Sequence, residues 1–232
     1  MHRSHHTEPH FSTRNNWLRA GVLGANDGLI STASLLMGLV AGGANTPALL
    51  LAGISAMAAG AVAMAAGEYV SVSSQADTER ADLVKEKREL ERNPEAELQE
   101  LADIYKARGL DDALARQVAE SLTRHDALGS HARDEIGISE TIETNPIQAA
   151  WASALAFCTG AILPVLIVML TPADALITAL VFSTLLGLTL LGWVSARLGG
   201  APAGRAVLRI VLWGVGAMTV SGIIGHLAGV TI

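Results

Sequence analysis

Apolar residues are gathered into five long stretches, and short polar or glycine-rich links separate most of them. Each stretch is long enough to cross a lipid bilayer as a helix, which takes about 20 apolar residues. The stretches cover residues 18–40, 48–72, 147–170, 175–196 and 207–230. The pattern therefore predicts an all-α membrane protein with five transmembrane helices.

The second and third stretches are separated by a long polar segment, residues 76–144, whose apolar positions recur at helical spacing. No Gly or Pro occurs from Ala76 to Arg92, so we expect span two to continue to Arg92 as a helix. Pro94 suits the first turn of a second helix that reaches Arg108, and a third should run from Asp111 to His125. Gly129 is expected to interrupt the chain before a short helical piece at 130–136. The segment thus reads as a three-helix insertion.

These boundaries divide the chain into four parts. The first part is a polar, His-rich N-terminal tail at residues 1–16, and the second comprises spans one and two at 17–75. The helical insertion follows at 76–144, and spans three to five occupy 145–232.

The arginines predict the orientation in the membrane, because cytoplasmic links are enriched in Lys and Arg. Arg197, Arg205 and Arg209 flank the link between spans four and five, whereas the links after spans one and three contain no basic residue. We expect a cytoplasmic N-terminus, a cytoplasmic insertion and an extracytoplasmic C-terminus.

Charge is concentrated in the insertion. The chain has 22 acidic and 16 basic residues, and outside 77–143 the only acids are Glu8, Asp27, Glu68 and Asp174. There is no basic patch and no nucleic-acid-binding motif, so nucleic acid is not an expected partner.

Asp27 stands alone in the middle of the first apolar stretch. It lies about 13 Å along the helix from Leu18, too deep for its short side chain to reach either interface. It needs a proton, a cation or a polar group on a neighbouring helix. A structural hydrogen bond is one interpretation, but ionisable residues inside a span are rare and mostly functional, which favours an ion or proton site.

Met64 and Glu68 lie four residues apart on one face of span two, at a depth comparable with that of Asp27. A thioether facing two carboxylates suits a borderline-soft divalent metal better than Mg²⁺ or Ca²⁺, which favour oxygen shells. Met64 alone would indicate packing.

The insertion carries repeated acidic pairs. Glu86 and Glu89 end an acidic stripe, Glu97 and Glu100 repeat the three-residue step, and His131 and Glu135 are spaced to bind one ion. A solvated helix face is the alternative for acidic stripes. The repetition and the His–Glu pair favour a carboxylate-rich metal site.

Two motifs, Asn26-Asp-Gly-Leu-Ile-Ser-Thr32 and Met64-Ala-Ala-Gly-Glu-Tyr-Val-Ser71, resemble the vacuolar iron transporter family, and the resemblance covers nearly the whole chain. It implies export of Fe²⁺, often also Mn²⁺, from the cytosol, coupled to inward protons, by a homodimer in the lipid bilayer. It also implies site residues. Asp27, Met64 and Glu68 would line the transport path, and Glu86, Glu89, Glu97, Glu100 and the 131–135 stretch would bind metal.

His131 stands where the family pattern has Met, a departure that bears on metal preference or site geometry.

We therefore expect a transporter and not an enzyme, located in a bacterial inner membrane, with iron or manganese as substrate and no tightly bound cofactor. One rival is a membrane-anchored carboxylate ferroxidase, but ferritin-like sites need Glu-x-x-His, and no Glu here has His three residues later. The other rival is a metal sensor that does not transport.

Overall fold

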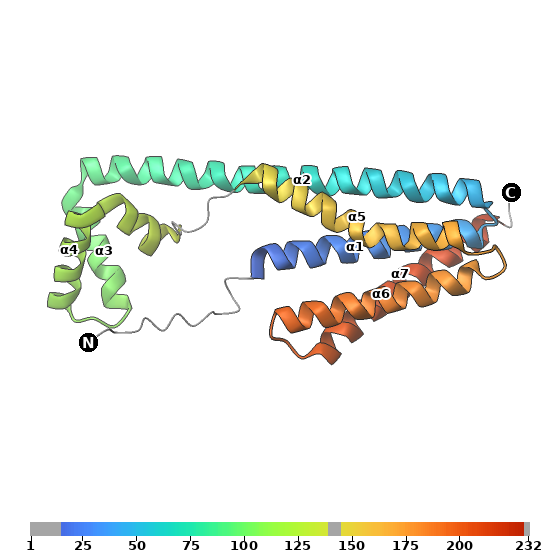
Figure 1. Ribbon diagram of the computed structural model, residues 1–232. Coiled ribbons are helices and arrows are strands. Elements are labelled where there is room, and N and C mark those ends of the chain that lie inside the picture. The colour runs from blue at the N-terminus through green and yellow to red at the C-terminus, as the bar shows by residue number, and fades with distance from the viewer. Residues whose placement is uncertain (1–14, 139–144, 230–232) are drawn as a thin grey trace, which may run out of the picture. The chain divides into compact units, whose positions relative to one another are not determined.

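The computed structural model describes residues 15–138 and 145–229, with side chains from residue 21, and every regular element in these residues is a helix (Figure 1). The predicted tail 1–16 lies outside the described residues except for its last two positions. The elements are α1 (Asn15–Ala41), α2 (Thr46–Arg92), α3 (Pro94–Ala107), α4 (Asp112–His131), the π-helical turn η2 (Ala132–Ile136), α5 (Pro146–Leu170), α6 (Leu176–Leu198) and α7 (Ala203–Gly229).

Five of these helices, α1, α2, α5, α6 and α7, are long and apolar enough to cross a membrane, which confirms the five predicted spans. The prediction that span two continues to Arg92 is also confirmed. With 47 residues, α2 is about 70 Å long, more than twice the thickness of a ~30 Å hydrocarbon core. Its polar C-terminal half must therefore extend beyond the bilayer.

The chain divides into two compact units. The apolar unit comprises Met1–Tyr69 and Ile147–Ile232, and the insertion unit comprises Val70–Pro146. The division falls within α2, so this helix contributes to both units.

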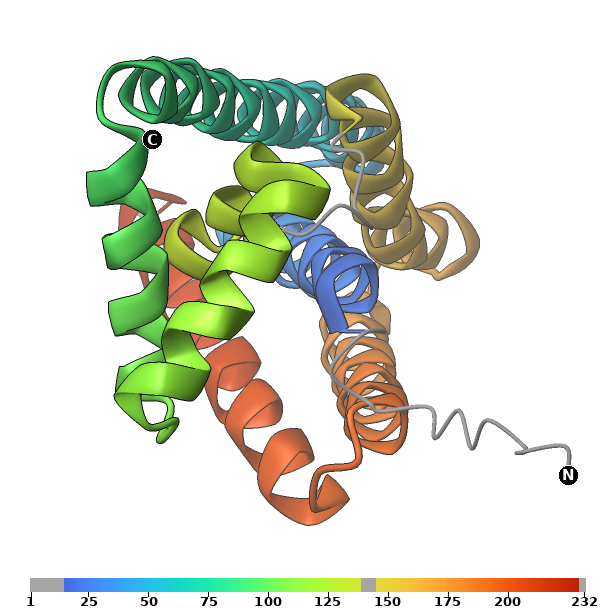
Figure 2. The ribbon, with the colours of Figure 1, turned by 90° about the vertical axis from the view of Figure 1, so that its left-hand side faces the viewer.

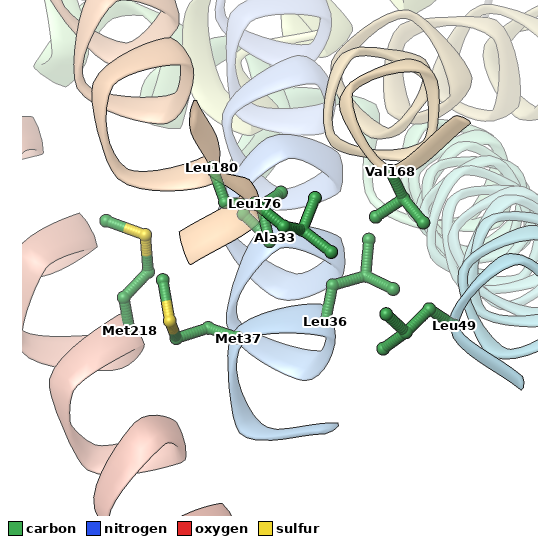
Figure 3. Close-up of a cluster of buried hydrophobic side chains, with 8 residues drawn as sticks. All are labelled: Ala33, Leu36, Met37, Leu49, Val168, Leu176, Leu180 and Met218. Atoms are coloured by element: carbon green, nitrogen blue, oxygen red, sulfur yellow. The ribbon is translucent and has the colours of Figure 1, made fainter. Parts of the chain in front are cut away.

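The core of the apolar unit draws on all five of its helices (Figure 3). Leu36 of α1 points toward Leu49 of α2 and Val168 of α5, while Met37 lies beside Met218 of α7 (Figure 3). Leu180 of α6 is fully buried in the same cluster. These side chains lie near the links after α1 and α5, so they tie together the ends of four helices.

Glycines let the helices of the apolar unit approach closely, as small residues do in membrane bundles. A Cβ atom on Gly28 of α1 would overlap the carbonyl oxygen of Phe157 in α5. A Cβ on Gly225 of α7 would overlap the carbonyl oxygen of Gly38 in α1. The helix α1 is therefore held at backbone contact on two sides.

The insertion unit has a much smaller core, in which α3 and α4 lie side by side (Figure 2). Leu101, Ala102 and Ala119 are buried there, whereas Leu114 of α4, although apolar, is 47% exposed.

The predicted interruption at Gly129 is wrong, because the break lies at Asp126. Asp126 has non-helical backbone angles (φ −159°, ψ 95°), and its carboxylate accepts a hydrogen bond from the Gly129 N–H at 3.0 Å. An aspartate that accepts from the third following N–H caps the start of a helix. Asp126 thus starts a new helical piece that runs into η2.

Candidate functional site

Four of the predicted metal ligands of the insertion unit come together around His131. His131 Nδ1 lies 3.0 Å from Glu86 Oε1 and 2.8 Å from Glu135 Oε2. Glu86, Glu97 and His131 each offer one ligand atom, and these atoms lie within 4.8 Å of one another. We call Glu86, Glu97, His131 and Glu135 the insertion cluster.

The cluster is assembled from four helical pieces: Glu86 from the C-terminal part of α2, Glu97 from the first turn of α3, His131 from the end of α4 and Glu135 from η2. Its centre is shielded from water. The histidine is 0% exposed, Glu86 is 3% and Glu97 is 8%. Charged residues are almost never this buried unless they are paired or hold a metal.

Local sequence explains how His131 and Glu135 reach this position. The kink at Asp126 redirects the end of α4, and the Ser130 hydroxyl donates to the Asp126 carbonyl at 2.6 Å. The π-helical turn then ends at Gly137, whose φ of 81° lies in the left-handed region that favours glycine. Single π turns often occur at functional sites.

A polar latch holds η2 against α3. Asp134 accepts hydrogen bonds from the Tyr105 hydroxyl at 2.9 Å and from Arg108 Nη1 at 2.7 Å. Burial opposes the charged form of Asp134, but hydrogen bonds from Arg108, Tyr105 and Arg133 outweigh it and lower the pKa of Asp134 below its ordinary value of 3.8. The latch fixes the residue next to Glu135.

Excess negative charge surrounds the cluster. Burial raises the pKa of Glu97 above its ordinary value of 4.5, and the negative charge of Glu100 raises it further. Carboxylates must be deprotonated to bind a metal, and burial disfavours the charged form of Glu97. A bound cation would therefore have to stabilise that negative charge.

The other two predicted insertion ligands lie at the margin. Glu89 forms an ion pair with Lys85 at 3.3 Å, and Glu100 is exposed. Both act on the cluster by charge, since each raises the pKa of Glu97. The structure therefore brings together one member of each predicted glutamate pair.

In the apolar unit, Asp27 lies on an open stripe of an otherwise buried helix. Leu23, Asp27, Ser31 and Leu35 are spaced by four residues and are all exposed. The intervening positions Ala25, Leu29 and Ala33 are buried. The Ser31 hydroxyl donates to the Asp27 backbone carbonyl at 2.6 Å, and within the described residues the Asp27 carboxylate makes no hydrogen bond.

Met64 and Glu68 are half-buried and share the face of α2 on which Gly60 contacts α5. A Cβ on Gly60 would overlap the ring of Phe157, the residue whose carbonyl also contacts Gly28 of α1. Asp27 therefore lies near the level of Gly60, with Met64 about 6 Å and Glu68 about 12 Å further along the α2 axis. The three side chains are staggered in depth.

Sequence reasoning missed two groups, the break at Asp126 and the latch of Asp134, Tyr105 and Arg108. The N-cap preference of Asp is the signal that could have located the break. No sequence pattern marks the latch, since Asp134 lies 26 positions after Arg108 and 29 after Tyr105.

Comparison with known proteins settles the relationship of this chain. The profile of the VIT family matches residues 18–226, a range that contains every predicted site residue. The chain belongs to the VIT family.

Its VIT relatives include a protein of Acanthamoeba castellanii named vacuolar iron transporter, 41% identical over 95% of this chain and 83% of that protein. Vacuolar iron transporter homolog 2 of Arabidopsis thaliana is 36% identical over 91% of this chain and 84% of its own length. VIT-like transporter 1b of Glycine max is 33% identical over 93% of this chain and 78% of its own length. Together with the five apolar helices, this membership indicates an integral membrane protein.

Proposed function

We propose that this VIT family member moves ferrous iron, and also manganese, out of the cytoplasm in exchange for protons. The observation that carries the proposal is the 41% identity, over nearly the whole chain, to a protein named vacuolar iron transporter. The side chains agree with this substrate, because carboxylates, an imidazole and a thioether together suit a divalent transition metal.

The insertion cluster collects the ion in this proposal. If the N-terminus is cytoplasmic, as the arginine placement favours, then the insertion unit is cytoplasmic too. Its buried Glu86, Glu97 and His131 supply the ligands, and Glu89 and Glu100 add negative charge that attracts cations.

Asp27, Met64 and Glu68 then form successive ligands of the transport path. Their stagger along α1 and α2 suits an ion that is passed from one group to the next. Proton binding to Asp27 or Glu68 competes with metal binding, because ligands must be deprotonated, and this competition couples the two fluxes.

A second copy of the chain covers the open stripe of α1 in this proposal. A carboxylate facing lipid is unfavourable by roughly 3 kcal/mol or more at the bilayer centre. Pairing the Asp27 stripes of two copies removes the carboxylates from lipid and places the path at the dimer interface. The bacterial inner membrane remains a prediction, and the relatives are named for the vacuole.

Proteoliposomes test the proposal. Purified protein is reconstituted with an Fe²⁺-quenched dye and a pH dye inside the vesicles. We expect Fe²⁺ entry to accelerate when the interior is acidic, and the interior pH to rise as Fe²⁺ enters. Tight Fe²⁺ binding without any flux would support a sensor and contradict transport, and flux that is indifferent to the pH gradient would contradict proton exchange.

A further inference from the structure

His131 is the only nitrogen ligand in the part of the insertion cluster that the structure describes. It is 0% exposed, and its Nδ1 faces carboxylates from two elements, Glu86 of α2 and Glu135 of η2. Glu97 of α3 completes the set of groups around it.

The protein's own hydrogen bonds do not satisfy this arrangement. Nδ1 carries at most one hydrogen, so it can donate to only one of the two carboxylates. Glu86 Oε1 and His131 Nε2 are both buried without a hydrogen-bond partner among the described residues. An unpaired buried polar atom costs about 1–3 kcal/mol, more when charged, so the cluster is built for something that it binds.

We propose that His131 determines which divalent cation the insertion cluster accepts, favouring transition metals such as Fe²⁺, Co²⁺ and Zn²⁺ over Mg²⁺ and Ca²⁺. This inference rests on the proposed function of the cluster as the site that collects metal. Carboxylates alone form the oxygen shell that Mg²⁺ and Ca²⁺ prefer. An imidazole among them binds transition metals well and hard cations poorly.

The surrounding structure holds the imidazole in place, as a selective site requires. The Asp126 break sets the direction of the helical piece that bears His131. The Asp134 latch to Tyr105 and Arg108 fixes η2 on the C-terminal side of the ring. Asp126 and Asp134 are positioning residues, and His131 is the ligand.

The test is a titration of the full-length protein in detergent with Co²⁺, a spectroscopic substitute for Fe²⁺, with and without excess Mg²⁺. The variant His131→Glu makes the cluster all-carboxylate. The control His125→Glu changes an exposed histidine of the same helix. We expect the preference for Co²⁺ over Mg²⁺ to fall by at least about tenfold in His131→Glu and to stay unchanged in His125→Glu.

Bound Cu²⁺ gives an independent signature, because a coordinated nitrogen splits its electron paramagnetic resonance signal. The measurement uses a background in which the tail histidines His2, His5, His6 and His10 are replaced by Gln. In that background the splitting should be present with His131 intact and with His125→Glu, and absent with His131→Glu. If His131→Glu does not fold, His131→Gln keeps a neutral polar side chain and should lose the splitting with about tenfold weaker Co²⁺ binding.

An unchanged Co²⁺ to Mg²⁺ preference in a folded His131 variant overturns the inference, and so does a wild-type protein that does not bind Co²⁺. Failure of the proposed function looks different. In that case the wild-type protein binds Co²⁺ selectively, but Fe²⁺ does not cross the proteoliposome membrane.

Discussion

Carboxylates have opposite surroundings in the two units. In the insertion unit, Glu86 and Glu97 are buried against a fully buried histidine. In the apolar unit, Asp27 lies exposed on α1, and its carboxylate has no hydrogen bond within the described residues. The first arrangement gathers several ligand groups within one unit of the chain. In the second, a single carboxylate stands without a partner among the described residues.

The two units are also held together differently. In the apolar unit, α1 meets α5 and α7 at glycines, so close packing of the backbones holds these helices together. In the insertion unit the core is small, and the Asp134 latch supports it. Mutations should therefore separate the units: changes in packing should damage the first, and changes in charge the second.

The largest expected effect comes from removing the open carboxylate. In Asp27→Asn we expect Fe²⁺ flux to fall by about 100-fold or more, because an intramembrane ionisable group of a transport path has no substitute. Metal binding by the insertion cluster should be unchanged. The matched control is Asp174→Asn, an exposed carboxylate in the link between α5 and α6, which should transport normally.

Packing of α1 against α7 comes next. Gly225→Ala places a methyl group on the Gly38 carbonyl, and we expect a loss of stability of about 1–3 kcal/mol, as for other overpacked sites. Thermal unfolding in detergent measures it. Gly216→Ala on the same helix meets open space and should not lower the melting temperature, and equal melting of the two variants would contradict the contact.

Neutralising one ligand of the insertion cluster should weaken metal binding without stopping transport. In Glu97→Gln we expect Co²⁺ affinity to fall at least about tenfold, while Fe²⁺ flux at saturating concentration stays near the wild-type rate. Glu91→Gln, an exposed glutamate of α2, serves as the control. Unaltered affinity in Glu97→Gln would remove Glu97 from the site.

The raised pKa of Glu97 gives the insertion unit a pH dependence with a definite sign. Because the folded state holds this proton more tightly, the stabilisation from protonation is complete below the ordinary value of 4.5 and disappears as pH rises through the raised value. Chelator-treated protein should thus lose stability from pH 4.5 upward. Added Co²⁺ should stabilise more at higher pH, since it needs the deprotonated ligands. A metal-free protein whose melting temperature rises over this range, or the same slope in Glu97→Gln, would contradict the assignment.

The smallest expected effect is at the latch. Arg108→Gln removes an ion pair whose guanidinium side is half exposed, so we expect only a small loss of stability. Co²⁺ affinity should nevertheless fall severalfold, because η2 is less firmly held. The control Arg116→Gln breaks exposed ion pairs with Glu95 and Glu120, so it should lower stability by a similarly small amount. It should leave Co²⁺ affinity unchanged.

The sequence was sufficient for the spans and insufficient for the cluster. A run of about 20 apolar residues has one structural solution in a membrane, so all five spans were predictable. Helical spacing placed Glu86 with Glu89 and Glu97 with Glu100, but it cannot tell which member is buried. Which glutamate is buried depends on tertiary structure, namely on the kink at Asp126 and the latch at Asp134. These two features bring His131 and Glu135 close to Glu86, which is far from them in sequence.

The central claim is that the insertion cluster collects the ion and that Asp27 belongs to the transport path. The measurement that tests it most directly is the initial rate of Fe²⁺ flux into proteoliposomes as a function of Fe²⁺ concentration. It compares the wild type, Asp27→Asn and the double variant Glu86→Gln/Glu97→Gln. We predict that the double variant reaches the wild-type maximum at higher Fe²⁺, whereas Asp27→Asn has no saturable flux at any concentration. A wild-type maximum in Asp27→Asn would contradict the account.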